Sequence, residues 1–287
     1  LNRDENFRKA ITYALDRQRL GDSLVKGPFT TIYPGGIYAG TSFYDKDSTV
    51  YYPFSIDSAK EALAAAGLTD TDGNGFVNLA SGEDLNVTLL SQSDYATDKT
   101  LAEGVVAMMA DAGVKVTLSL LTGKDFDNAR DAGTYDWIVY RNQSDLITVV
   151  QNTDKLAPVG PATAINHRAN AAGELDLLPF EEAMVKDVNA FIGSRDPAER
   201  IALMKDYQKL YTENLFGIGL TAYPGALIVN KRFANIPAGA PIYMYNWAED
   251  NIIRERVFVP ADKQIDAELH PDTLPGELGG AGPVMAK

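Results

Sequence analysis

LNVTLLSQSDYATDKTLAEGVVAMMADAGVKVTLSLL, residues 85–121, places two apolar segments on either side of a segment with helical spacing. LNVTLLSQ is rich in aliphatic and β-branched residues, which predicts a strand. In the middle, Leu101, Val105 and Met108 recur on one helical face, and Thr97 is the expected N-cap. VKVTLSLL alternates apolar and polar residues and predicts a second strand with one buried face. Strand, helix and strand in this order predict a parallel pair joined by a crossover helix.

The neighbouring segments repeat this alternation. GKDFDNARDAG predicts a short helix, and YDWIVYR predicts a third strand. Upstream, SIDSAKEALAAAG predicts a helix that Ser55 caps and Gly67 closes. Short joints between alternating strands and helices are typical of an α/β fold with a mostly parallel sheet covered by helices.

The rest of the chain contains helical and aperiodic segments. DENFRKAITYALDR predicts a helix with Asp4 as N-cap, whereas residues 26–53 show no period and predict a long irregular loop. Two long helices are expected after residue 172, and Asp196 caps the second. IGLTAY and ALIVNKR then predict two paired strands joined at Pro224.

The composition argues against several classes of function. A net charge of −13 disfavours nucleic-acid binding, which needs clustered Lys and Arg. There is no apolar run near the length that spans a membrane. The absence of Cys excludes thiol chemistry, and His167 and His270, the only two histidines, exclude a histidine-rich metal site. GxSxG, HExxH and GxxxxGK(S/T) motifs are absent, so we expect neither an enzyme nor a required cofactor.

An Asp-rich stretch, LTDTDGNGFVNLASGED, matches the start of a calcium loop at Asp70, Asp72 and Asn74. A complete EF-hand loop has a bidentate Glu at position twelve, where this chain has Ser81. A strand rather than a helix follows the loop. Two interpretations stay open: a tight turn formed by Asp, Asn and Gly, or the same turn holding a structural calcium ion.

Several motifs in the same order resemble those of the family 5 extracellular solute-binding proteins, the peptide and nickel receptors of ABC importers. The family helix R-x-A-(L/I)-x-Y-A-(I/L)-D-R-x-x-(I/L) is matched by Arg8, Ala10, Ile11, Tyr13, Ala14, Leu15, Asp16, Arg17 and Leu20. YPFSIDSAKEALAAAG resembles the next family motif, and a D-x-D-G-D-G turn commonly follows it. YDWIVYRNQSD and PAERIALMKDYQKL resemble later motifs, so the resemblance extends over residues 1–230.

The resemblance implies a periplasmic binding protein-like lobe with a C-terminal return segment. Family members are longer, so residues 1–222 are expected to form the second lobe of a two-lobed receptor. Residues 223–287 would be the crossover and a segment that belongs with the first lobe. The chain begins LNRDENFRKA, with neither an initiator Met nor an apolar leader. We therefore expect a processed or excised form whose signal peptide is missing.

By the same resemblance, the protein is expected to capture a small solute, a peptide in the first place, between two lobes. It would be a monomer, periplasmic or anchored at the cell surface, with the membrane permease of an ABC importer as its partner. The competing hypotheses are a hydrolase with paired carboxylates in an α/β scaffold, and a calcium-dependent interaction module around residues 70–78.

Ligands of α/β sheets bind beyond the carboxyl ends of parallel strands, which here means the residues after DWIVY. Arg141, Asn142 and Asp145 are the candidates there. The resemblance makes Asp145 the partner of a peptide α-amino group, although it is equally suited to capping a turn. His167 and Tyr223 are further candidates, with a surface-loop role and a packing role as their respective alternatives.

Overall fold

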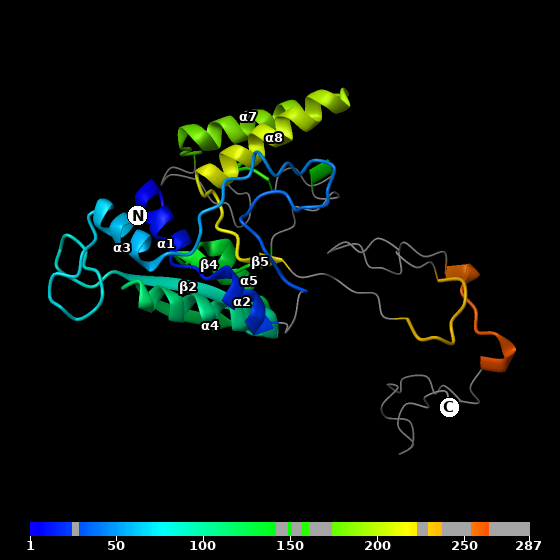
Figure 1. Cartoon of the computed structure of the whole chain (residues 1–287), viewed down its shortest axis with the longest axis horizontal. Helices are drawn as coiled ribbons and strands as arrows, with labels where there is room; N and C mark the ends of the chain where they lie inside the picture. Colours follow the sequence, from blue (N-terminus) through cyan, green and yellow to red (C-terminus); the bar gives the residue numbers. More distant parts are fainter. Residues whose placement is uncertain are drawn as a thin grey trace, which may run out of the picture. The chain divides into compact units, whose positions relative to one another are not determined.

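The computed structural model describes residues 1–24, 29–141, 149–150, 156–160, 174–222, 229–236 and 254–263. The chain divides into two compact units, Leu1–Pro224 and Gly225–Lys287. The expected division after residue 222, into a second lobe and a segment that belongs with the first lobe, stays a prediction. The elements of the first unit (Figure 1) are α1 Glu5–Tyr13, α2 Arg17–Leu24, β1 Thr31–Ile32, α3 Ile56–Ala65, β2 Asn86–Gln92, α4 Ala96–Asp111, β3 Lys115–Leu121, α5 Gly123–Ala132, β4 Trp137–Ile138, α7 Pro179–Gly193, α8 Pro197–Glu213 and β5 Thr221–Ala222.

A parallel sheet with the strand order β3-β2-β4 lies at the centre of the first unit. The predicted α/β class is therefore confirmed, and β2, α4 and β3 form the expected crossover unit. The third strand is much shorter than the predicted YDWIVYR, because only Trp137 and Ile138 pair with β2. Before β4 the carboxylate of Asp136 accepts the Thr88 N–H at 2.8 Å, and the Asp136 N–H donates to the Thr88 carbonyl at 3.0 Å.

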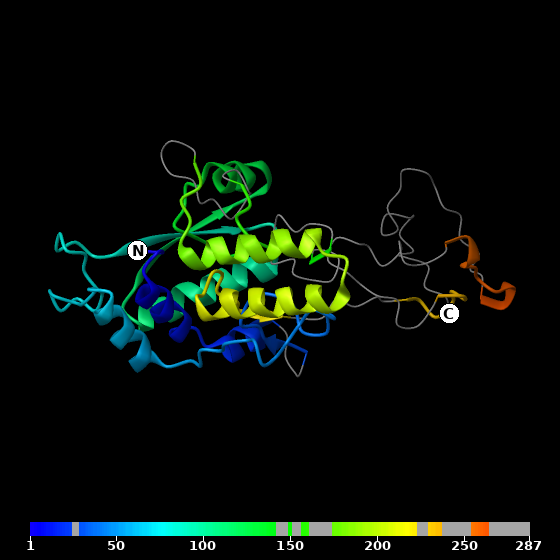
Figure 2. The same ribbon diagram turned by 90° about the horizontal axis from the view of Figure 1, so that it is seen from above.

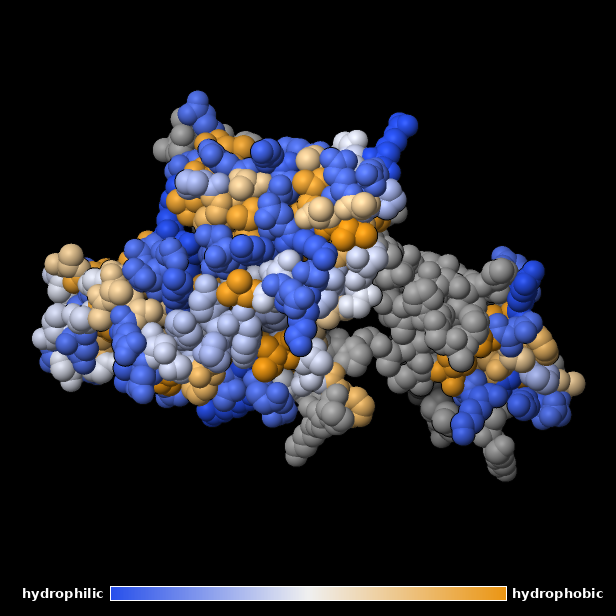
Figure 3. Space-filling view, turned by 45° about the horizontal axis from the view of Figure 1, so that its top comes forward, coloured by the Kyte–Doolittle hydropathy of each residue, from blue (hydrophilic) through white to orange (hydrophobic). Residues whose placement is uncertain are grey.

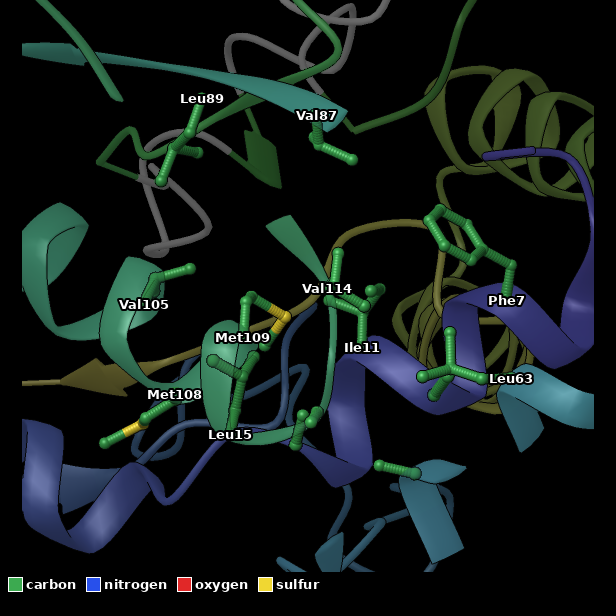
Figure 4. Packing of buried hydrophobic residues seen from close by; sticks show 14 of the residues in the cluster. Phe7, Ile11, Leu15, Leu63, Val87, Leu89, Val105, Met108, Met109 and Val114 are labelled. Atoms are coloured by element: carbon green, nitrogen blue, oxygen red, sulfur yellow. The ribbon is translucent and has the colours of Figure 1, made fainter. Parts of the chain in front are cut away.

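Helices α1, α3 and α4 share one apolar core with the sheet (Figure 4). Val87 and Leu89, two residues apart on β2, both point into this core, as the alternation of a strand requires. Leu90 points the other way and is also buried, and α5 packs against β2 and β3. Helices thus cover the sheet as predicted. The labelled members of this core are Phe7, Ile11, Leu15, Leu63, Val87, Leu89, Val105, Met108, Met109 and Val114.

The helix N-termini follow the predicted capping chemistry at three places. The side chain of Asp4 accepts the Phe7 N–H, and that of Ser55 accepts the Ser58 N–H. Asp196 likewise accepts the Ala198 N–H in front of Pro197–Glu213. Each contact satisfies an amide that has no partner inside its own helix, which fixes where the helix begins.

Strand β5 pairs with β1. The predicted pairing of IGLTAY with ALIVNKR stays a prediction, because residues 223–228 lie outside the described residues. The two short strands are antiparallel, with Thr31 opposite Ala222 and Ile32 opposite Thr221. Thr31 and Ile32 belong to the segment predicted to be an irregular loop. The two strands are separated by most of the sequence of the first unit, so no local pattern predicts that they pair.

Helices α7 and α8 pack side by side and form a second apolar core (Figure 2). Met184, Val188 and Phe191 of α7 meet Met204 and Tyr207 of α8. Beside this core the chain also buries a carboxylate, that of Asp187. Its Oδ2 atom has no hydrogen-bond partner among the described residues.

Asp187→Asn is expected to stabilise the protein above pH 6. Burial, reinforced by Asp206 and opposed by Lys186, raises the pKa of Asp187 to about 6. Because the folded state disfavours the charged form, ionisation of Asp187 lowers the free energy of unfolding. This loss is absent near pH 4, grows between about pH 4 and 6, and is constant above.

Urea unfolding of Asp187→Asn at pH 7.5 should show a free energy of unfolding about 1–2 kcal/mol higher than that of wild type. At pH 4 the two proteins should unfold alike. Asp206→Asn, which removes only the neighbouring charge, should give a smaller gain; a loss of stability for Asp187→Asn at pH 7.5 would contradict the prediction.

The described part of the second unit is small. Its elements are two 3₁₀ turns, η3 Arg254–Arg256 and η4 Ala261–Lys263. An antiparallel bridge joins Ala234 and Phe258, with the Ala234 N–H donating to the Phe258 carbonyl at 2.8 Å.

None of the described helices is both long and apolar enough to cross a bilayer. Figure 3 shows hydrophilic residues over much of the side in view, with smaller apolar areas between them. This surface agrees with the strong negative charge of the sequence.

Candidate functional site

The carboxyl ends of the three parallel strands meet at one edge of the sheet, where the sequence predicted a ligand site. The chain leaves β2 through Ser93, Asp94 and Tyr95 and leaves β4 through Arg141. The carboxylate of Asp94 accepts the Gly123 N–H at 2.7 Å, which ties the end of β2 to the start of α5. Loops after β2 and β3 are thereby fixed to each other at this edge.

Arg141 is the predicted site residue that the structure describes beyond β4. Its guanidinium carbon lies 3.9 Å from the centroid of the Tyr95 ring, a stacked cation–π arrangement. Its Nε atom is 3.6 Å from Oδ2 of Asp98, on the first turn of α4. A residue after β4 is thus held by two residues that follow β2.

Asp98 is almost fully buried, unlike most carboxylates. Burial raises its pKa, and the nearby Arg141 opposes this effect by favouring the charged form. The Thr97 hydroxyl donates to Oδ1 of Asp98 at 3.3 Å, so Thr97 is not the N-cap that the sequence predicted. The helix begins at Ala96, and the preceding Tyr95 forms no side-chain cap.

The other predicted ligand residues, Asn142, Asp145, His167 and Tyr223, lie outside the described residues, and their roles stay predictions. Tyr95 and Asp98 were not predicted from the sequence. The rule about carboxyl strand ends could have found them, because it applies to β2 as much as to β4. Which residues after β2 face Arg141 depends on the order of strands in the sheet.

Asp70, Asp72 and Asn74 come together in one tight turn. Oδ1 of Asp70 accepts the Gly73 N–H at 2.8 Å, and Oδ2 accepts the Gly75 N–H at 2.9 Å. These backbone bonds lower the pKa of Asp70, that from Gly75 most strongly. Asp72 accepts the Asn74 N–H, and Asn74 accepts the Phe76 N–H. The side chains thus hold the turn through bonds to nearby backbone, a feature that both interpretations of this stretch share.

Calcium is expected to leave the melting temperature unchanged. Among the described residues, no group of three or more carboxylate or histidine side chains is arranged to hold a metal ion. A ligand that binds only the folded state must raise Tm with its concentration. Thermal unfolding in millimolar calcium and in EDTA should therefore coincide. A rise in Tm with calcium that disappears in Asp70→Ala would support the calcium interpretation instead.

Comparison with known proteins shows the family to which this chain belongs. Residues 1–157 match the family described as bacterial extracellular solute-binding proteins, family 5 middle. The chain belongs to this family, as its motifs indicated. The relatives named below are binding proteins rather than enzymes, so the hydrolase hypothesis gains no support.

Two relatives are similar over almost the whole chain. One is the periplasmic alpha-galactoside-binding protein of Rhizobium meliloti, 57% identical over 99% of this chain and 42% of the relative. The other is the solved structure of the periplasmic binding protein MelB from Agrobacterium fabrum in complex with stachyose. It is 57% identical, with a TM-score of 0.85, over 98% of this chain and 43% of that one. The chain thus spans less than half the length of either relative.

More distant structures share the fold. The periplasmic oligopeptide-binding protein of Thermotoga maritima is 16% identical, with a TM-score of 0.67, over 86% of this chain and 48% of that one. At this identity the likeness establishes the α/β periplasmic binding protein architecture, which was the predicted fold class.

Proposed function

We propose that the protein to which this chain belongs captures α-galactosides outside the cytoplasmic membrane and delivers them to an ABC importer. One observation supports this most strongly: 57% identity over 98–99% of the chain to two periplasmic proteins, one named for α-galactosides and one solved with stachyose. The permease partner and the periplasmic location are part of the same proposal.

The sugar replaces the peptide that the family resemblance favoured. The oligopeptide-binding protein of Thermotoga maritima shares only the fold, at 16% identity. Of the two relatives at 57% identity, one is an alpha-galactoside-binding protein and the other was solved with stachyose, itself an α-galactoside. The change of ligand also changes the expected role of Asp145. A carboxylate that would pair with a peptide ammonium instead accepts hydrogen bonds from sugar hydroxyl groups.

Arg141, Asn142, Asp145, His167 and Tyr223 are all capable of such contacts, because each side chain has donors or acceptors for hydroxyl groups. A site that hydrogen-bonds a hydroxyl discriminates strongly against a ligand that lacks it, since its own polar groups are then left unpaired. Such a site would separate galactose from glucose by the position of a single hydroxyl.

Isothermal titration calorimetry on the intact gene product tests the proposal. Stachyose, raffinose and melibiose should bind with Kd values of about 1 μM or tighter. Maltose, an α-glucoside, and a mixture of short peptides are the matched controls and should bind much more weakly. Binding of peptides or maltose without binding of any α-galactoside would refute the proposed substrate and leave the family assignment intact.

A further inference from the structure

Tyr95 is an aromatic residue on the surface, at the edge where a ligand is expected. It follows β2 directly and precedes α4, and 44% of its area is exposed. Its side chain neither caps the helix nor belongs to either apolar core. Aromatic side chains are common in the lining of ligand sites, and the sites of α/β sheets lie beyond the carboxyl ends of the strands, where Tyr95 is found.

Arg141 contacts one face of the Tyr95 ring. The guanidinium carbon is 3.9 Å from the ring centroid, so the planar group lies close against one face of Tyr95. Tyr95 stays 44% exposed although Arg141 lies against its ring. The Arg141 side chain is itself one-third exposed, so it is not enclosed by the protein.

Asp98 fixes the guanidinium at the cost of burying a carboxylate. Its side chain is 4% exposed and lies 3.6 Å from Arg141 Nε. Oδ2 of Asp98 has no hydrogen-bond partner among the described residues. Burying a carboxylate is costly unless the charge has a partner, and a lone ion pair rarely repays that cost in stability. The pair is better explained by the geometry that it imposes on Arg141.

We propose that Tyr95 is a stacking platform for one sugar ring of the α-galactoside, and that Asp98 is a positioning residue that holds Arg141 beside it. This inference rests on the proposed function. A galactose ring has one face of C–H groups and a rim of hydroxyl groups. The electron-rich face of an aromatic ring attracts these C–H groups, and the N–H groups of an adjacent guanidinium donate to the hydroxyl groups.

Substitutions of Tyr95 in the intact gene product test the platform, with stachyose titrated by calorimetry. Tyr95→Ala is expected to weaken binding about tenfold to a hundredfold, because it removes a central aromatic contact. Tyr95→Phe keeps the ring, and its Kd for stachyose should stay within about threefold of that of wild type.

Tyr51→Ala is the matched control. Tyr51 is also 44% exposed and has the Arg17 guanidinium 5.8 Å from its ring, but it does not follow a strand of the parallel sheet. It should bind stachyose like wild type.

A double-mutant cycle tests the role of Asp98. Asp98→Asn should weaken stachyose binding about threefold to tenfold in the wild-type background. In the Arg141→Lys background, which keeps the charge and loses the planar group, the same change should have almost no further effect. A purely structural role of Asp98 would give equal losses in both backgrounds. Melting temperatures of all variants show which of them are folded.

The outcomes separate this inference from the function on which it rests. If wild type binds stachyose and folded Tyr95→Ala binds it equally well, the platform is refuted and the proposed function stands. If Tyr95→Ala and Tyr95→Phe lose affinity equally, the hydroxyl rather than the ring makes the contact, and stacking is refuted. If wild type binds no α-galactoside, both proposals fall together.

Discussion

Replacing Arg17 with Met should lower the free energy of unfolding by about 3–5 kcal/mol. Arg17 is the arginine of the YALDR motif, and only 3% of it is exposed. Its Nε donates to the Gly219 carbonyl at 2.7 Å, and its terminal nitrogens donate to the carbonyl and hydroxyl of Thr12. Met fills a similar volume but leaves these buried acceptors without donors.

Chemical denaturation of Arg17→Met beside wild type measures this loss. Arg19→Met is the matched control, because Arg19 lies on the same helix and is exposed. We expect the control to change stability by less than about 0.5 kcal/mol. If both variants unfold at the same denaturant concentration as wild type, the motif arginine has no structural role and its contacts are incidental.

Gly219→Ala should cost about 3 kcal/mol or more, or prevent folding. A Cβ at this position would overlap the Tyr33 carbonyl oxygen and backbone atoms of Pro34 and Gly35. These are main-chain atoms, so no change of rotamer can relieve the clash. The close approach exists because the segments around residues 34 and 219 run side by side, with the Tyr33 N–H donating to the Leu220 carbonyl.

Gly193→Ala is the control for the same substitution without the clash. Gly193 is the last residue of α7, and a Cβ there meets nothing within 4 Å. Alanine favours the helix over glycine, so this variant should be as stable as wild type or slightly more stable. Comparison of soluble yield and Tm for the two alanine variants isolates the effect of the contact. Equal stability of both would show that the approach at Gly219 is not needed.

Local patterns determined the elements that are formed by neighbouring residues. The strand, helix and strand between residues 85 and 121 follow from apolar periodicity, and the caps at Asp4 and Ser55 follow from short-range hydrogen bonds. The order of several motifs was enough to identify the family, and the family implied the fold. The Asp-rich turn was also correctly placed, because its geometry depends on bonds between residues at most a few positions apart.

Other features required the tertiary structure, because they join residues that are remote in sequence. The pairing of β5 with β1 and the contact of Arg17 with Gly219 each bring together segments from opposite ends of the first unit. The site at the edge of the sheet depends in the same way on β2 lying beside β4. A sequence pattern records which face of an element is apolar, but not which distant element covers it. The family and the class of fold were therefore determined by the sequence alone. The meeting of Tyr95, Asp98 and Arg141 was decided by the order of strands in the folded sheet.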